Sequence, residues 1–290
     1  MTLVLTLVSQ SNDVAQLAKA APGGAGDVAD LSGGGWRVAE RGVAGGQDLI
    51  AWLEAETPRL GADWAITPAA KRKKRLLISD MDSTIIGQEC LDELADFAGL
   101  KAEVSAITER AMRGELDFAG ALTQRVAMLK GLALTALEQC HNERVRLNPG
   151  ARELVATMKA HGARAVLVSG GFRYFTSRVS KMAGFDADRA NTLIDDGKAL
   201  TGAVGIPILG REAKLAALQE ETAALGTVVD DSVAMGDGAN DLDMIRAAGL
   251  GVAYKAKPIV AAETQARIQY TDLRAALFFQ GYRVSEFVNA

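Results

Sequence analysis

The chain has 290 residues, of which 49% are hydrophobic, and its formal net charge is −4 at pH 7. This length and apolar content allow one substantial core and a second, smaller one. The negative charge argues against a nucleic-acid-binding surface, so we expect no nucleic-acid partner.

The first 70 residues predict a small α+β domain. Their apolar periodicity predicts strands at 3–8, 36–40 and 63–67 and helices at 12–21 and 48–56. Three consecutive glycines at 33–35 interrupt this pattern, and no ligand-binding constellation is visible. A regulatory role and the support of a homodimer both remain open for this domain.

A basic run at 71–75 follows this first domain. Such a run can be a nucleic-acid or sorting patch, but a solvated linker is the commoner structure. We therefore expect a linker here, and a second domain that spans 71–290.

Two carboxylates follow the first strand of the second domain. The apolar run 76–79 predicts a buried strand, and Asp80 and Asp82 come directly after it. Neighbouring carboxylates repel each other and resist burial, so the pair makes sense if a metal ion neutralises part of its charge. One acid can then attack an electrophile while the other transfers protons. The carboxyl ends of strands are also where open α/β sheets bind ligands.

The segment at about 86–150 predicts a helical cap inserted over this site. Amphipathic stretches at 90–100 and 118–130 predict two cap helices, and closure of such a cap would exclude water. Glu89 and Arg125 are the charged side chains of interest here. Their ordinary explanations are a glutamate at a helix start and an arginine whose stem lies along an apolar stripe.

A second strand end carries Ser169 and Gly170. The apolar run 165–168 predicts the strand, and a helix that starts near Phe172 would offer free N–H groups to an anion. Glycine lets the backbone approach such an anion closely. The alternative is a strand-to-helix turn that binds no ligand.

Two further segments complete the pattern. Lys214 lies in the predicted first turn of a helix, where the helix dipole disfavours a cation unless an anion faces it. Asp237 and Asp241 follow a predicted strand at 233–236 and can face one site. Between these segments and Ser169, residues 191–204 predict a β-hairpin, whose role the sequence leaves open.

These segments together resemble the haloacid dehalogenase superfamily of phosphotransferases. The carboxylate pair, Ser-Gly-Gly, the lysine and Gly-Asp-Gly-x-Asn-Asp occur in that order, and the resemblance covers roughly residues 75–290. Within the superfamily the chain is most similar to the phosphoserine phosphatases. The segments that carry this closer similarity are 80–84 with 88–89, Arg125 ahead of 129–131, and 168–172.

The resemblance agrees with the fold class that the predicted elements favour. That class is α/β, with a doubly wound parallel sheet as a haloacid dehalogenase-like core. Its strands end at Asp80, Val168 and Gly236, and another strand is predicted at 250–253. The inserted helical cap and the small amino-terminal α+β domain complete the expected architecture.

The resemblance also implies a reaction. Asp80 is expected to attack phosphorus and become an aspartyl phosphate, while Asp82 acts as general acid and then as general base. Ser169 and Lys214 would bind the phosphoryl group. The expected reaction is the hydrolysis of O-phospho-L-serine to L-serine and phosphate, the last step of serine biosynthesis.

A magnesium ion is the implied cofactor. The resemblance places it on the side chain of Asp80, the backbone carbonyl of Asp82 and the side chain of Asp237, with Asp241 orienting this shell from behind. Nothing in the sequence resembles a zinc or iron site.

The implied substrate contacts come from the cap and from the core. Arg125 would hold the substrate carboxylate and Glu89 its ammonium, while Gly170 and Asn240 complete the contacts. Phosphothreonine, homoserine phosphate and phosphosugars remain alternative substrates. A non-enzymatic regulator resembling a receiver domain is a further alternative, but it would need neither Asp82 nor an inserted cap.

The sequence also predicts a location. Its start lacks the charged residues and long apolar region of a signal peptide, and no apolar stretch is long enough to span a membrane. Cys90 and Cys140 have no metal-binding or redox spacing, which favours a reducing compartment. We expect a cytoplasmic protein with no membrane partner.

Overall fold

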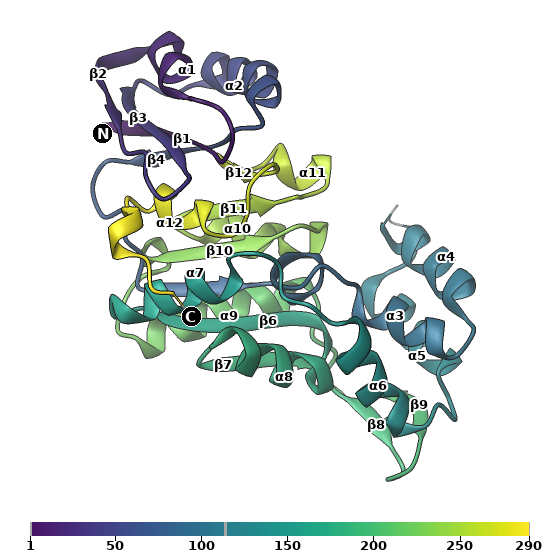
Figure 1. Ribbon diagram of the computed structural model, residues 1–290. Helices are drawn as coiled ribbons and strands as arrows, with labels where there is room; N and C mark the ends of the chain where they lie inside the picture. Colours follow the sequence, from purple (N-terminus) through teal and green to yellow (C-terminus); the bar gives the residue numbers. More distant parts are fainter. Residues whose placement is uncertain (1, 113–114, 290) are drawn as a thin grey trace.

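The computed structural model describes residues 2–112 and 115–289. Within these residues one large sheet has ten strands: β1 (Leu3–Ser9), β2 (Gly24–Asp30), β3 (Arg37–Val43), β4 (Asp63–Pro68), β5 (Leu76–Ser79), β6 (Arg164–Phe172), β7 (Ala187–Asn191), β10 (Ser232–Gly236), β11 (Leu250–Tyr254) and β12 (Ala266–Ile268). Their spatial order is β2-β3-β1-β4-β12-β11-β10-β5-β6-β7 (Figure 1). The strands from β12 to β7 are parallel to one another, whereas β1 to β4 pair antiparallel.

Helices cover both faces of the parallel half. They are α7 (Ala151–Ala160), α8 (Arg173–Ala183), α9 (Arg211–Ala224), α10 (Leu242–Ala247) and α12 (Ala275–Phe279). Successive residues of a strand point to opposite faces, so Leu77 belongs to the core with α7, α8 and α12, while Leu76 and Ile78 belong to the core with α9 and α10. The predicted doubly wound α/β sheet is confirmed.

The cap follows β5 and contains four helices within the described residues. They are α3 (Cys90–Phe97), α4 (Lys101–Met112), α5 (Phe118–Met128) and α6 (Leu134–Arg144). The predicted helices at 90–100 and 118–130 correspond to α3 and α5. None of the helices found in the described residues is long and apolar enough to cross a membrane.

The predicted hairpin at 191–204 is present and supports the cap. Its strands are β8 (Leu193–Asp195) and β9 (Leu200–Val204). The N–H of Gly131 donates to the carbonyl of Leu200 at 2.8 Å, and the N–H of Leu200 donates to the carbonyl of Leu132 at 2.9 Å. These bonds fix the loop between α5 and α6, so the hairpin holds one end of the cap helices (Figure 1).

The amino-terminal strands have a core of their own with α1 (Ala15–Ala20) and α2 (Gln47–Leu60). Their sheet is nevertheless continuous with the parallel half, because Ala65 pairs with Ala266 and Trp64 with Arg267. The predicted domain boundary near residue 70 falls in the connection between β4 and β5 and stays a prediction. The glycine-rich strand β2 is an addition to the predicted elements.

The expectation that the basic run 71–75 is a solvated linker is wrong for two of its residues. Arg72 lies 2.5 Å from Glu40 on β3, and its guanidinium also donates to the carbonyls of Phe278 and Phe279. The Nζ of Lys74, a buried residue, donates to the carbonyl of Asp230 at 2.7 Å. The run therefore ties the amino-terminal strands to α12.

We predict that Arg72→Met destabilises the protein by about 2–3 kcal/mol, because it leaves Glu40 and two carbonyls without their charged donor. Urea denaturation measures this loss. Lys71→Met is the control, because Lys71 is an exposed member of the same run. Equal effects of the two substitutions would contradict a structural role for Arg72.

Candidate active site

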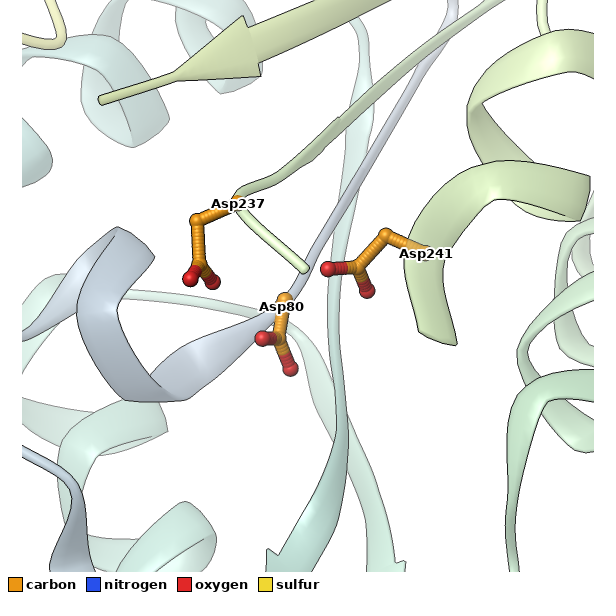
Figure 2. Close-up of side chains that lie close together, drawn as sticks. All are labelled: Asp80, Asp237 and Asp241. Atoms are coloured by element: carbon orange, nitrogen blue, oxygen red, sulfur yellow. The ribbon is translucent and has the colours of Figure 1, made fainter. Parts of the chain in front are cut away.

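Three carboxylates meet at the carboxyl end of the parallel strands. Asp80 follows β5, Asp237 follows β10, and Asp241 begins α10. Each carboxylate has an oxygen within 4.8 Å of the others (Figure 2). Gly236 permits this approach, since a Cβ atom there would lie 2.3 Å from the Cγ atom of Asp241. The predicted convergence of Asp237 and Asp241 on the Asp80 site is what the structure shows.

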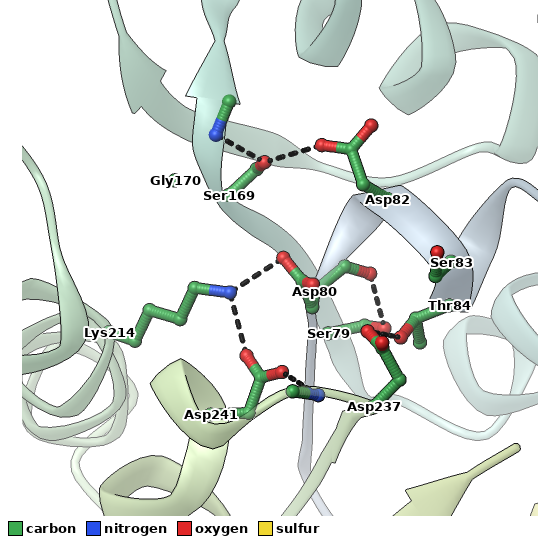
Figure 3. A network of polar contacts seen from close by, with 12 residues as sticks. Ser79, Asp80, Asp82, Ser83, Thr84, Ser169, Gly170, Lys214, Asp237 and Asp241 are labelled. Atoms are coloured by element: carbon green, nitrogen blue, oxygen red, sulfur yellow. Dashed lines mark hydrogen bonds and ion pairs between the residues drawn. The ribbon is translucent and has the colours of Figure 1, made fainter. Parts of the chain in front are cut away.

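Lys214 lies buried between two of these acids. Its Nζ is 2.6 Å from the Oδ1 of Asp80 and 2.6 Å from the Oδ1 of Asp241 (Figure 3). Burial alone would lower the pKa of Lys214, but the two carboxylates outweigh it and raise the pKa. The lysine is therefore fully charged. A lysine in the first turn of a helix is expected to face an anion, and for Lys214 on α9 that anion is the carboxylate of Asp80.

Asp82 has a different environment from Asp80. Its Oδ1 accepts the N–H of Cys90 at 2.9 Å, and its Oδ2 lies 3.3 Å from the Ser169 hydroxyl (Figure 3). Burial raises its pKa, although the Cys90 N–H acts in the opposite direction. A Cβ atom at Gly171 would lie 2.8 Å from the Oδ2 of Asp82, so a side chain there would have to displace this carboxylate. Asp82 thus lies beside hydrogen-bond donors of the core and the cap, whereas Asp80 contacts Lys214.

A tight turn joins the two acids to the cap. Ser83 has φ 54°, an unusual value for a residue other than glycine, of the kind that clusters at functional sites. Its hydroxyl donates to the Oε1 of Glu89 at 2.6 Å. Thr84, the next residue, donates to the Oδ1 of Asp237 at 3.4 Å. The turn therefore links Glu89 to the carboxylate cluster.

A cavity of about 360 Å³ opens in front of Asp80. It is lined by eight of the ten predicted site residues: Asp80, Asp82, Glu89, Arg125, Ser169, Gly170, Asp237 and Asn240. The other two, Lys214 and Asp241, lie behind Asp80 instead of lining the cavity. Core and cap thus both contribute charged groups to one cavity.

The two charged cap residues are held by few protein contacts. The Nη1 of Arg125 donates to the Thr108 hydroxyl at 3.0 Å, and its Nε donates to the carbonyl of Ala121 at 3.2 Å. Burial lowers the pKa of Arg125, while Asp92 and Glu89 act against that change. Burial raises the pKa of Glu89 to about 7, and the charge of Asp82 adds to the rise.

The carboxylate cluster fits a hard cation. Burial raises the pKa of Asp80 well above its usual value, and Lys214 opposes this only in part. Burial also raises the pKa of Asp237 to about 7, with Asp241 adding to the rise. A divalent cation would stabilise the ionised forms, and carboxylate oxygens are the ligands that magnesium prefers. Both oxygens of Asp241 already accept bonds, from Lys214 and from the N–H of Gly238.

Three residues at this site are additions to the predicted set. The ring of Phe118 lies against Gly170 and Gly210, where added Cβ atoms would be 2.9 and 3.2 Å from it. Asn191 donates to the carbonyls of Gly170 and Leu209. Lys257 lines the cavity beside Asp237. Phe118 occupies the start of the predicted helix at 118–130, which is the one signal that could have indicated it.

Comparisons with known proteins agree with this geometry. A family model described as haloacid dehalogenase-like hydrolase matches residues 77–246. The chain belongs to the haloacid dehalogenase-like hydrolases. This membership confirms the predicted family and the prediction of an enzyme.

Relatives of this hydrolase include named phosphoserine phosphatases. The phosphoserine phosphatase of Streptomyces coelicolor is 45% identical over 225 residues. These residues are 76% of this chain and 54% of the relative, so the chain spans about half of that protein's length. That of Polaromonas sp. is 49% identical over 191 residues, which are 64% of this chain and 81% of the relative. A solved phosphoserine phosphatase with a phospho-aspartyl intermediate analogue has a TM-score of 0.67 at 39% identity, covering 71% of this chain and 99% of that one.

The raised pKa of Glu89 predicts a pH-dependent cost in stability. Its pKa is about 7 in the folded protein against 4.5 ordinarily, so the fold favours the protonated form of Glu89. The contribution of this form to the free energy of unfolding is fully present below pH 4.5 and is lost as the pH rises through 7. Glu89→Gln should therefore gain about 1–2 kcal/mol relative to wild type between pH 4.5 and pH 8 in chelator, because solvent screening at this exposed residue reduces the full effect of the shift. Urea denaturation at both pH values measures this.

The control for this stability experiment is Glu138→Gln, at an exposed position of α6. It should change the free energy of unfolding equally at both pH values. The same pH-independent behaviour in Glu89→Gln would show that Glu89 titrates normally.

Proposed function

We propose that the protein is a magnesium-dependent phosphatase that hydrolyses O-phospho-L-serine through an aspartyl phosphate on Asp80. The observation that carries this proposal is the single cavity that joins Asp80 and Ser169 on the core to Glu89 and Arg125 on the cap. Asp80 can attack a phosphoryl group to which the Ser169 hydroxyl donates. Arg125 and Glu89 carry charges opposite to those of the carboxylate and the ammonium of an amino acid.

The first chemical step is the attack of Asp80 on phosphorus. A phosphate ester is dianionic, and each unit-charge pair at about 4 Å with an effective dielectric near 20 costs roughly 4 kcal/mol. Lys214 already contacts Asp80 and supplies one of the positive charges that offset this repulsion. Ser169 would bind a phosphoryl oxygen through its hydroxyl.

Asp82 transfers the proton in both halves of the reaction. Burial raises its pKa and so favours the protonated form that donates to the departing serine oxygen. In the second half it removes a proton from the water that attacks the aspartyl phosphate. The relative solved with a phospho-aspartyl intermediate analogue supports the aspartyl phosphate between these two halves.

The magnesium ion would be held by Asp80, Asp237 and the backbone carbonyl of Asp82. When bound, it supplies positive charge that orients the phosphoryl group for in-line transfer. Asp241 has both oxygens committed to Lys214 and Gly238, which supports a role in orienting this shell from behind.

The cap residues would select the substrate. Arg125 uses two donors on Thr108 and Ala121, which leaves guanidinium N–H groups for a substrate carboxylate. Glu89 would bind the ammonium, and Gly170 and Asn240 would complete the contacts. A homodimer and a cytoplasmic location stay predictions of the sequence.

The role of Asp82 predicts different losses on different leaving groups. In Asp82→Asn, turnover of phosphoserine should fall by roughly 10²- to 10⁴-fold, the usual contribution of general acid–base catalysis. Para-nitrophenolate needs little protonation, so para-nitrophenyl phosphate should still give a rapid burst followed by slow turnover. Stopped-flow absorbance measures the burst, and an equally slow first step on both substrates would contradict the role.

The metal site predicts loss of activity on chelation and its recovery with magnesium. Calcium should bind without supporting turnover, because its larger and more flexible oxygen shell spoils in-line geometry. Asp237→Asn should raise the magnesium concentration for half-maximal activity by on the order of tenfold or more. Full turnover in excess chelator would show that the cluster has another purpose.

The cap predicts substrate-specific losses. Arg125→Ala and Glu89→Gln each remove a charged hydrogen bond, which should cost roughly 2–4 kcal/mol, or about 30- to 1000-fold in kcat/KM for phosphoserine. Para-nitrophenyl phosphate should be hydrolysed nearly as well as by wild type. Arg144→Ala is the control, because this exposed cap arginine pairs with Glu93 and Asp96 outside the cavity.

Two outcomes would overturn this assignment of the cap. Equal losses on both substrates would show that the residues support cap structure or closure. No loss on phosphoserine, together with a loss on phosphothreonine, homoserine phosphate or a phosphosugar, would identify a different substrate.

A further inference from the structure

A second cavity lies where the amino-terminal strands join the rest of the sheet. Its volume is about 360 Å³, within the 300–1,000 Å³ range typical of small-molecule sites. Its walls come from α2 and β4 on one side and from β11, α11 (Pro258–Ala261) and β12 on the other. Within the described part of the chain it shares no lining residue with the active-site cavity.

The walls of this junction cavity are mostly apolar and partly aromatic. Trp64 and Ile268 are buried residues that line it. Pro58 and Pro258 add rigid apolar surface, and Tyr270 lines it while remaining 46% exposed. An exposed aromatic ring beside an apolar hollow favours a ligand with a flat apolar body.

One cation in the junction cavity has an exchangeable partner. The Arg267 side chain is 16% exposed, and its guanidinium lies 4.9 Å from the centre of the Trp64 ring. Its Nη1 is 2.6 Å from Glu54, whose side chain is 47% exposed and can turn into solvent. Its Nε has no hydrogen-bond partner among the described residues. A ligand carboxylate can therefore replace Glu54 on a guanidinium that the ring already holds in place.

The second acid of the junction cavity is already committed. Asp63 accepts the N–H groups of Gln269, Tyr270 and Thr271 and the hydroxyl of Thr271. It is thus unsuited to bind an ammonium group. An amino acid would find a carboxylate partner here but would leave the aromatic walls unused.

We propose that the junction cavity binds a small aromatic carboxylate, and that its occupancy changes substrate binding at the active site. The link is α11, which has residues in both cavities. Pro258 and Ala261 line the junction cavity, while Ile259 and the residue directly before the helix, Lys257, line the active-site cavity. The N–H of Lys257 also donates to the carbonyl of Asp237 at 3.0 Å. A ligand that displaces α11 therefore displaces residues that face the substrate.

Binding is tested on the full-length protein with 4-fluorobenzoate, followed by fluorine NMR. Wild type should bind it saturably with a dissociation constant on the order of 1 mM or tighter. Binding should weaken about tenfold or more in Arg267→Met and in the cavity-filling Ala262→Phe. Arg246→Met is the matched control, because Arg246 pairs with Glu263 outside the cavity. Melting temperatures establish that each variant is folded.

Three outcomes would overturn the binding proposal. The first is that 4-fluorobenzoate shows no saturable binding to wild type, and the second is that neither Arg267→Met nor Ala262→Phe weakens its binding. The third is that 4-fluorobenzyl alcohol, which lacks the carboxylate, binds equally well. Displacement of the probe by L-serine at similar concentrations would also overturn the aromatic class of ligand. None of these readouts depends on catalysis.

The coupling to the active site rests on the proposed function and has its own measurement. Saturating 4-fluorobenzoate should shift the KM for phosphoserine about fivefold or more in wild type, and should leave it unchanged in Arg267→Met. Binding without any shift would overturn the coupling and leave the site standing. A wild-type protein that binds the probe but hydrolyses no phosphoserine would instead contradict the proposed function.

Discussion

The buried ion pairs of Lys214 hold the catalytic elements in one arrangement. Its ammonium lies 2.6 Å from Asp80 and 2.6 Å from Asp241, and both carboxylates are almost fully enclosed. Breaking a buried pair strands an uncompensated charge, which typically costs 3–5 kcal/mol. The lysine on α9 therefore fixes the end of β5 relative to the start of α10. This arrangement also places a positive charge beside Asp80.

The same strand end places two aspartates in different surroundings. Asp80 faces Lys214, whose charge favours the ionised form, while burial and the neighbouring carboxylates raise its pKa. Asp82 faces the Ser169 hydroxyl and the N–H of Cys90, and burial raises its pKa. The turn at Ser83 separates these environments and carries the chain into the cap. One short segment thus determines both the chemistry and the position of Glu89.

The sequence predicted well where the strand-end residues lie, because their placement depends on local patterns. The run 76–79 before Asp80 and the glycines beside Ser169 and Asp237 each indicate a strand end, and parallel strands bring such ends to one edge of a sheet. Contacts between distant segments carry no such local pattern. The pairing of β4 with β12 and the packing of Phe118 against Gly170 and Gly210 could be identified only in the structure. The glycine-rich β2 was missed because strand propensity there is low.

A covalent aspartyl phosphate on Asp80 can be trapped by quenching the reaction with borohydride. Borohydride reduces an acyl phosphate to an alcohol, so trapping during turnover of phosphoserine should convert residue 80 to homoserine. Peptide mass spectrometry locates the change. Modification is expected at position 80 alone, dependent on substrate and magnesium, and it should accumulate in Asp82→Asn when para-nitrophenyl phosphate is the substrate. Undiminished turnover by Asp80→Asn, with no trapped residue in wild type, would contradict this mechanism.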